Sequence, residues 1–260
     1  MVFDERLILE NKQDNIIYNE HLVRYEFARQ FVQEKEVLDI ACGSGYGTKI
    51  LAKSGAKKVT GIDISEDAVK IAQEKYSQEN IKYITANAED TKQIDHNFDL
   101  VVSFETIEHL KNADKFLQEI KRITKPDGLV FISTPNREVS QEKNPYHLKE
   151  YNKQEFQELI NKYFKYYKIL DQSNGLASCI SVDSNQAIIH NQASQQPLYF
   201  IAICSQSDIL NQVVTKNFVS LNYQALERIY KNPIMRLSDK IYPFLTKIPI
   251  IKKIINNNLI

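Results

Sequence analysis

The chain has 260 residues, 43% of them hydrophobic, so its length suits one α/β domain with additions, or at most two small domains. Basic and acidic residues number 33 each, and this zero formal net charge excludes a general attraction to polyanions. The three cysteines form no CxxC pair, which favours a reducing, cytoplasmic setting over a disulfide framework or a cysteine zinc site. No secretory signal is visible, and no apolar run approaches the roughly 18 residues that span a bilayer.

Helices and strands are predicted to alternate along the first half of the chain. An apolar stripe at helical spacing predicts a helix over residues 17–33, and a short apolar run predicts a strand at 37–40. The same criteria predict helix 47–55, strand 57–64, helix 65–78, strand 81–87, strand 98–104, helix 113–124, a turn at 126–128 and strand 129–134. This alternation implies a parallel sheet with helices on both faces.

The second half of the chain is predicted to complete the sheet. Residues 152–164 are predicted to form a helix, and 165–171 and 198–204 are predicted to form the last strands. Between them, residues 172–197 are polar and rich in Ser, Asn and Gln. This segment is longer than a usual connection, so an elaborated loop is expected there.

A cluster of glycines interrupts the first strand-to-helix connection. Three of the seven glycines of the chain, Gly43, Gly45 and Gly47, fall within VLDIACGSGYGT at residues 37–48. A glycine turn between a strand and a helix opens many nucleotide-binding sheets, because glycine permits positive φ and close approach of a ligand to the main chain. A tight turn that serves packing alone is the alternative.

Two common phosphate-binding patterns do not fit these glycines. A P-loop needs a glycine before Lys49 and a hydroxyl residue after it, but Thr48 and Ile50 occupy those positions. A dinucleotide-binding turn needs its third glycine at position 48, one residue later than Gly47.

The segment instead resembles motif I of class I S-adenosylmethionine-dependent methyltransferases. In that family an acidic strand end and a glycine loop hold the methionine half of the cofactor. The resemblance implies cofactor contacts from Asp39, Gly43, Gly45 and Gly47, while Ala41 stands where many relatives have glycine. The cofactor carries an ammonium and a sulfonium but no phosphate, so nearby acidic residues suit it better than lysine.

Three later segments match the same family in order and spacing. Asp63 ends VTGIDIS about 20 residues beyond the glycines, where a carboxylate grips ribose hydroxyls, and Ile64 follows it at the cofactor site. TANAED resembles the adenine loop, which implies a backbone contact from Ala88 and an acceptor for the adenine amino group on Glu89. KPDGLVFIST resembles the turn and fifth strand.

The family resemblance implies an α/β fold with a Rossmann-like, doubly wound sheet. Seven strands are expected, mostly parallel with the last strand antiparallel, together with helical N- and C-terminal additions. We therefore predict a helical lid at residues 1–34, the methyltransferase domain at 35–205, and a helical, basic, amphipathic tail at 206–260.

Candidate catalytic residues follow the fourth strand. That strand ends near Phe104, which is expected to face the cofactor because ligands of open α/β sheets bind beyond the carboxyl ends of the strands. Glu105, Glu108 and His109 follow at i, i+3, i+4 spacing, on one face of a helical turn. His109 is a candidate general base, since its ordinary pKa lies near neutrality, and Glu105 is the second catalytic candidate. A structural role is the alternative.

The pattern ExxEH, with a later TPN and the histidine of NPYHLKEY, is similar to two groups of O-methyltransferases. These are the ubiquinone-biosynthesis enzymes and the small-RNA 2′-O-methyltransferases, which place a divalent cation on two glutamates and two histidines. The similarity implies a Mg or Mn site on Glu105, Glu108, His109 and His147, where the cation would lower the pKa of the acceptor hydroxyl. Metal-free action of His109 remains open. We expect no nucleic acid partner, because the basic, aromatic surface that RNA requires is not apparent.

The two ends of the chain resemble bacterial enzymes of surface-polysaccharide synthesis. In the segment before motif I, His21 and Arg24 are candidates to contact the methionine carboxylate or the acceptor. From Arg228 onward the tail holds seven basic residues against one acid, Asp239. Residues 228–260 are therefore expected either to lie on an anionic membrane surface or to pack as a homodimer helix.

These features together predict an S-adenosylmethionine-dependent methyltransferase in the cytoplasm, with membrane association through its tail as one of the two expectations for residues 228–260. The expected reaction is O-methylation of a sugar or saccharide hydroxyl, an acceptor that rests on the resemblance. The alternatives are N- or O-methylation of another small molecule, such as an amino sugar or a quinol, and a non-catalytic cofactor-binding subunit of a polysaccharide-synthesis complex.

Overall fold

A computed structural model of the protein describes residues 16–94, 97–140, 144–173, 177–181, 196–210 and 218–221. The membrane and homodimer predictions for the tail from Arg228 fall outside these residues. Within the described part of the chain, no helix combines the length and the apolar character that a bilayer crossing requires.

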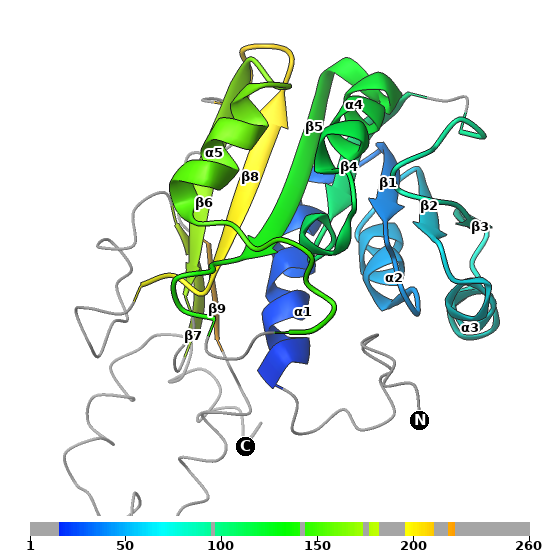
Figure 1. Ribbon diagram of the computed structural model, residues 1–260. Helices are drawn as coiled ribbons and strands as arrows, with labels where there is room; N and C mark the ends of the chain where they lie inside the picture. Colours follow the sequence, from blue (N-terminus) through cyan, green and yellow to red (C-terminus); the bar gives the residue numbers. More distant parts are fainter. Residues whose placement is uncertain are drawn as a thin grey trace, which may run out of the picture.

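One mixed sheet of nine strands forms the centre of the described structure, in the order β3-β2-β1-β4-β5-β8-β6-β7-β9 (Figure 1). Its strands are β1 Glu36–Ile40, β2 Lys58–Asp63, β3 Ile81–Thr85, β4 Phe98–Ser103, β5 Thr124–Pro135, β6 Tyr166–Ser173, β7 Ala177–Ser181, β8 Tyr199–Ser205 and β9 Phe218–Leu221. Strands β1 to β5 pair in parallel, while β8 runs antiparallel to both β5 and β6. The predicted α/β sheet, mostly parallel with an antiparallel late strand, is confirmed.

Two strands extend the predicted seven-stranded sheet at one edge. Strand β7 lies within residues 172–197, which were expected to form a loop, and β9 lies within the tail at 206–260, which was expected to be helical. Both predictions are wrong at these strands. Each strand pairs antiparallel with its neighbour, β7 with β6 and β9 with β7. Short edge strands depend on such pairing more than on an apolar pattern, so polar sequences can form them.

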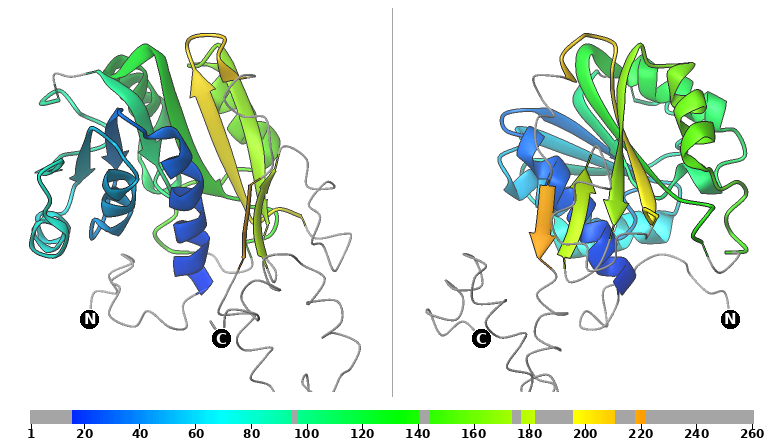
Figure 2. Two further views of the ribbon diagram at one scale, coloured as in Figure 1. Left: turned by 180° about the vertical axis from the view of Figure 1, so that it is seen from behind. Right: turned by 90° about the vertical axis from the view of Figure 1, so that its left-hand side faces the viewer.

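Five α-helices cover the two faces of the sheet (Figure 2). On one face lie α1 Ile16–Ala28, continued by a 3₁₀ turn at Arg29–Phe31, α2 Tyr46–Lys53 and α3 Glu66–Tyr76. On the other face lie α4 Ala113–Ile123 and α5 Lys153–Asn161. These counts refer to the residues that the structure describes.

Strand side chains alternate between the two helical layers. In β5, Leu129 and Phe131 pack with α1 and α2, while Val130 and Ile132 pack with α4 and α5. All four side chains are buried, which explains why the central strands are continuous apolar runs. The turn predicted at 126–128 lies inside β5 as an irregularity, because Phe98 pairs with Thr124 while Leu100 pairs with Leu129.

The connection between β3 and β4 is fastened to α4 by one carboxylate. Glu119 Oε2 accepts hydrogen bonds from the backbone N–H of Thr91 (3.0 Å), from its Oγ1 (2.6 Å) and from Arg122 (3.0 Å). The hydrogen bond from Arg122, followed by those from Thr91, lowers the pKa of Glu119 to about 2. This connection carries the predicted adenine loop, so the network fixes one wall of the candidate site.

Replacing this carboxylate is expected to produce a pH-dependent loss of stability. Because the folded pKa of Glu119 lies below its ordinary value, its stabilisation is present above about pH 4.5 and is lost as the pH falls toward 2. Glu119→Gln should therefore lower the free energy of unfolding by roughly 1–3 kcal/mol at pH 7 and by less at pH 3. Urea unfolding at both pH values tests this, with Glu74→Gln on the exposed side of α3 as the control. Equal losses at both pH values would contradict it.

Candidate active site

The glycine turn between β1 and α2 is shaped by two different requirements. Gly43 and Gly45 both have positive φ, at 53° and 85°. A Cβ added to Gly43 would have no described heavy atom within 4 Å, whereas one added to Gly45 would lie 2.7 Å from the Tyr83 hydroxyl oxygen. Gly43 therefore faces open space, where a ligand can approach the main chain, and Gly45 is required by the packing of the protein itself.

Gly47 is also a packing residue. A Cβ at this position would lie 2.0 Å from Cζ of Tyr25, a side chain of α1. The prediction that all three glycines contact the cofactor thus keeps its structural basis at Gly43, while Gly45 and Gly47 admit the rings of Tyr83 and Tyr25.

Ala41 opens the same turn in a left-handed conformation, with φ at 58°. This conformation costs a residue with a Cβ about 1–2 kcal/mol relative to glycine. The alanine that replaces the family's glycine therefore adds local strain, and it does not close the space beside Gly43.

Asp39 is enclosed by protein at the end of β1. Its side chain is fully buried, and its carboxylate accepts hydrogen bonds from Thr48 Oγ1 (2.6 Å) and from the Tyr25 hydroxyl (3.0 Å). Burial raises the pKa of Asp39 to about 7, against the effect of both hydrogen bonds. Asp39 therefore links the start of the glycine turn to both α1 and α2. These contacts argue against the predicted direct contact with the cofactor.

Asp63 joins the glycine turn to the end of β2. Its two carboxylate oxygens accept the backbone N–H groups of Gly43 and Ser65, each at 2.9 Å. Ser65 caps α3 by accepting from the N–H of Ala68 at 3.2 Å. The neighbouring Ile64 side chain is 66% exposed and so offers an uncovered apolar surface. Asp63 and Ile64 thus lie beside Gly43, as expected for a nucleoside site.

The predicted adenine loop follows β3. Ala88 is buried at 9% exposure. Glu89 accepts a hydrogen bond on Oε1 from the backbone N–H of Asn112, at 2.6 Å, and so ties the loop to the start of α4. The predicted adenine contact of Glu89 would therefore have to use its other oxygen or follow a rearrangement.

Phe104 follows the carboxyl end of β4, as predicted, and it is buried. Its ring packs edge-on against Tyr25, with the ring centroids 5.1 Å apart. Arg24, the neighbour of Tyr25 on α1, is also fully buried. Arg24 and Tyr25 thus bring α1 over the ends of the central strands.

Glu105 is held apart from the other predicted metal ligands. Its φ is 52°, a strained value for a non-glycine residue, and it exchanges two hydrogen bonds with Ser133. Its N–H donates to Ser133 Oγ at 3.0 Å, and that hydroxyl donates back to Glu105 Oε1 at 2.7 Å. Arg24 Nη1 lies 3.6 Å from the same carboxylate oxygen. The structure therefore does not bring Glu105 into the predicted four-residue metal set.

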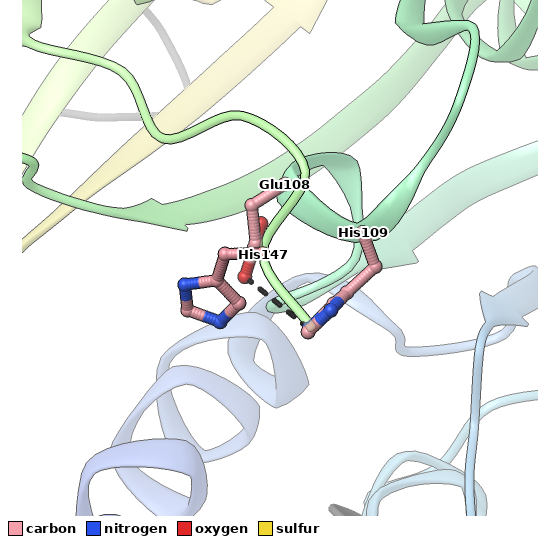
Figure 3. Close-up of side chains that lie close together, drawn as sticks. All are labelled: Glu108, His109 and His147. Carbon is pink, nitrogen blue, oxygen red and sulfur yellow. Dashed lines mark ion pairs between the residues drawn. The ribbon is translucent and has the colours of Figure 1, made fainter. Parts of the chain in front are cut away.

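The other three predicted ligands do converge. One ligand atom from each of Glu108, His109 and His147 lies within 4.8 Å of the others, and the three side chains point toward one another (Figure 3). Glu108 and His109 belong to the 3₁₀ turn Ile107–His109 after β4, and His147 belongs to the loop before α5. The backbone N–H groups of Leu148 and Lys149 donate to the Glu108 carbonyl at 2.8 and 3.1 Å, which fastens this loop to the turn.

Both imidazole rings are oriented through Nδ1. His109 Nδ1 lies 3.1 Å from the Tyr146 carbonyl oxygen, and His147 Nδ1 lies 2.6 Å from Glu150 Oε1. Donation from Nδ1 in both rings leaves each Nε2 with its lone pair, and this is the arrangement that outer hydrogen bonds impose on metal-binding histidines. His147 Nε2 accepts from Asn144 Nδ2 at 3.1 Å, so a cation would displace that contact.

Glu108 is a buried carboxylate with an unmatched oxygen. Its Oε2 accepts a hydrogen bond from Thr134 at 3.2 Å, while Oε1 has no hydrogen-bond partner among the described residues. Oε1 lies 4.0 Å from His109 Nε2. Burial, and then the neighbouring Glu105 carboxylate, raises the pKa of Glu108 well above its usual range. Such an oxygen needs either a proton or a cation.

The sequence patterns underestimated two residues of α1. Tyr25 falls within the apolar stripe that predicts the helix over residues 17–33, and nothing in the sequence marks its hydroxyl contact with Asp39. Arg24 is one of the two candidates on this helix, and its side chain is fully buried. Burial, and then the Arg24 charge, lowers the pKa of His21 well below its usual range, so Arg24 carries the positive charge here.

Comparison with known proteins finds methyltransferases that are similar in sequence to part of this chain. Residues 38–132 match the family model described as "Methyltransferase domain". A probable S-adenosylmethionine-dependent methyltransferase of Mycolicibacterium smegmatis is 32% identical over 161 residues, which are 60% of this chain and 62% of that protein. A ubiquinone biosynthesis O-methyltransferase of Hydrogenovibrio crunogenus is 36% identical over 120 residues, 44% of this chain and 49% of that one. The chain thus spans less than two thirds of the length of these curated relatives.

Solved structures share the fold. The YcgJ protein of Bacillus subtilis superposes with a TM-score of 0.55 at 18% identity, over 72% of this chain and 99% of that one. The plantazolicin methyltransferase BpumL, solved in complex with SAH, gives 0.55 at 18% identity, over 73% of this chain and 85% of that one. Residues 38–132 thus carry the match to a methyltransferase domain, and the solved structures share the fold of the chain around them.

The packing role of Gly47 makes an unusual prediction about helix stability. Alanine normally stabilises a helix relative to glycine by about 1 kcal/mol. Gly47→Ala should instead destabilise the protein by about 1–3 kcal/mol, because the Tyr25 ring that its Cβ meets is fixed on several sides. Thermal unfolding measures this as a fall of several degrees in Tm. A rise in Tm would show that Tyr25 does not occupy this space.

Proposed function

We propose that this protein transfers the methyl group of S-adenosylmethionine to a hydroxyl oxygen of an acceptor. The observation that carries the proposal is the convergence of Glu108, His109 and His147 just beyond the carboxyl end of β4. The glycine turn follows β1, which pairs in parallel with β4, so both groups lie at the same edge of the sheet. Open α/β sheets bind their ligands at this edge.

The described residues fit the cofactor. Gly43 leaves its main chain open, Asp63 offers carboxylate oxygens for ribose hydroxyls, and Ile64 offers an exposed apolar surface for the adenine face. Arg24 is fully buried, with Nη1 3.6 Å from Glu105 Oε1, and neither Nη1 nor Nη2 has a hydrogen-bond partner among the described residues, so the guanidinium can still donate to a ligand carboxylate. When bound, the cofactor supplies an electrophilic methyl carbon on its sulfonium sulfur.

The three converging side chains fit a divalent cation. A carboxylate with two imidazoles is a donor set better suited to Mn²⁺ than to Mg²⁺, which prefers oxygen ligands. The orphaned Glu108 Oε1 supports this assignment, because a cation would satisfy it. The chain's own contribution is then to hold the acceptor hydroxyl beside these ligands, where its pKa is lowered. In the metal-free alternative, His109 Nε2 accepts the hydroxyl proton directly.

The acceptor class is proposed from two sources. A saccharide hydroxyl follows from the resemblance of both chain ends to enzymes of surface-polysaccharide synthesis. A quinol-type acceptor is the second candidate, supported by relatives named ubiquinone biosynthesis O-methyltransferases. Tyr146 and Leu148, on either side of His147, are 45% and 58% exposed, and they favour an acceptor with an apolar part. Peripheral membrane contact through residues 228–260 would bring lipid-linked forms of either acceptor close, and a homodimer through this tail is the alternative.

The cofactor part of the proposal predicts specific binding of S-adenosylhomocysteine. Asp63→Asn should weaken this binding at least about tenfold, equivalent to about 1.4 kcal/mol, because it removes the charge that the ribose hydroxyls meet. Isothermal titration calorimetry measures the Kd, and Asp67→Asn in the exposed first turn of α3 is the matched control. No binding to the unaltered protein would overturn the cofactor assignment and leave a role other than methyl transfer.

The reaction itself is tested with methyl-labelled cofactor and a panel of nucleotide sugars, lipid-linked glycans, amino sugars and quinols. We expect label on an acceptor oxygen, activity lost by at least tenfold in chelator, and recovery when Mn²⁺ is added. His147→Gln should remove the response to Mn²⁺.

Two other results would change the proposal. Full activity in chelator would reject the cation and leave His109 as the base. Cofactor binding without transfer to any acceptor in the panel would favour the non-catalytic subunit.

A further inference from the structure

We propose that Tyr25 of α1 is a positioning residue, which fixes the glycine turn in its ligand-binding shape through a hydrogen bond to Asp39. This inference rests on the proposed function only in taking the ligand of the turn to be the S-adenosyl nucleoside. The contacts that carry it come from three structural elements around one aromatic side chain.

The first contact is a hydrogen bond to a buried charge. The Tyr25 hydroxyl donates to Asp39 Oδ1 at 3.0 Å, while Thr48 Oγ1 donates to Oδ2 at 2.6 Å. Asp39 is fully buried and stands two residues before Ala41, where the turn opens. One oxygen is thus held from α1 and the other from α2, so the carboxylate ties the entrance of the turn to both helices. Hydrogen bonds to a buried charged group are among the stronger ones in proteins.

The second contact is steric. The Tyr25 ring fills the space beside Gly47, where an added Cβ would meet Cζ at 2.0 Å. Its edge meets the rings of Tyr46 and Phe104, with centroids 5.6 and 5.1 Å away. Tyr46 begins α2 and Phe104 follows β4, so the ring contacts residues next to the glycine turn and residues next to the end of β4.

The helix that carries Tyr25 is itself anchored to the other half of the sheet. Arg24 Nε donates to Gln172 Oε1 at 2.8 Å, and Gln172 Nε2 donates to the Glu20 carbonyl at 3.1 Å. The Arg24 guanidinium lies over the Tyr199 ring, 4.1 Å from its centroid. Strands β6 and β8 thereby fix the position of α1. Because α1 is fixed, the contacts of Tyr25 hold the glycine turn in place. A tyrosine on a loose helix could not do so.

The Tyr25 hydroxyl also stabilises the Asp39 carboxylate in surroundings that disfavour a negative charge. The titratable groups that face the Asp39 carboxylate are Tyr25 from α1, Cys42 from the turn, Asp63 from β2 and Tyr83 from β3. None of these is a cation. The donors Tyr25 and Thr48 are therefore the groups described here that stabilise the ionised carboxylate against its burial.

The test uses Tyr25→Phe, which removes the hydroxyl and keeps the ring. We expect the Kd for S-adenosylhomocysteine to rise at least about tenfold in isothermal titration. We also expect hydrogen exchange at residues 41–48 to accelerate by a similar factor, while exchange in the core of β5 at 129–134 stays unchanged. Tyr166→Phe, which removes a hydroxyl at the start of β6, is the matched control and should alter neither quantity.

The two readouts separate positioning from general stability. Faster exchange at both 41–48 and 129–134, with the Kd within about twofold of the unaltered protein, would reduce Tyr25 to a structural residue. Unchanged exchange at 41–48 would overturn the inference outright. If the unaltered protein binds no S-adenosylhomocysteine, the proposed cofactor fails, and the exchange comparison still decides whether Tyr25 orders the turn.

Discussion

The structure depends on one buried carboxylate at the end of the first strand. Asp39 is removed from water and faces no cation, and two hydroxyl donors from α1 and α2 hold it. Burial raises the pKa of this carboxyl to about 7, and without the two donors its ionised form would be still less stable, so these contacts favour the observed docking of both helices. Their docking in turn fixes the glycine turn and leaves Gly43 as its open position. A requirement of folding thus creates the surface that a ligand can use.

The opposite wall of the site contains a second buried carboxylate, that of Glu108. Among the described residues, Glu108 Oε1 is buried without a hydrogen-bond partner, and the imidazoles of His109 and His147 converge on this carboxylate. Glu105, the nearest second carboxylate, is held by Ser133 and Arg24 and does not join the group. Glu105 is thus fixed outside the group, and Glu108, His109 and His147 form a donor set for a cation. The acceptor hydroxyl would then lie between the cation and the glycine turn.

Much of the fold could be predicted because parallel strands that are buried on both faces give continuous apolar runs, as in β4 and β5. The strands β7 and β9 could not, since each is only four or five residues long and is held by pairing with a neighbouring strand. Spacing along a turn brought Glu108 and His109 together, but it could not show that Ser133 and Arg24 draw Glu105 away. Likewise, three glycines looked alike in sequence, although partners distant in the chain require two of them for packing.

The most direct test of the account is a crystal structure of the protein with S-adenosylhomocysteine and Mn²⁺. The account predicts the nucleoside between Gly43 and Ile64, its sulfur directed toward the turn at 107–109, and anomalous density for Mn²⁺ among Glu108, His109 and His147. A crevice filled by the protein's own side chains, with the nucleoside bound elsewhere or absent, would contradict it.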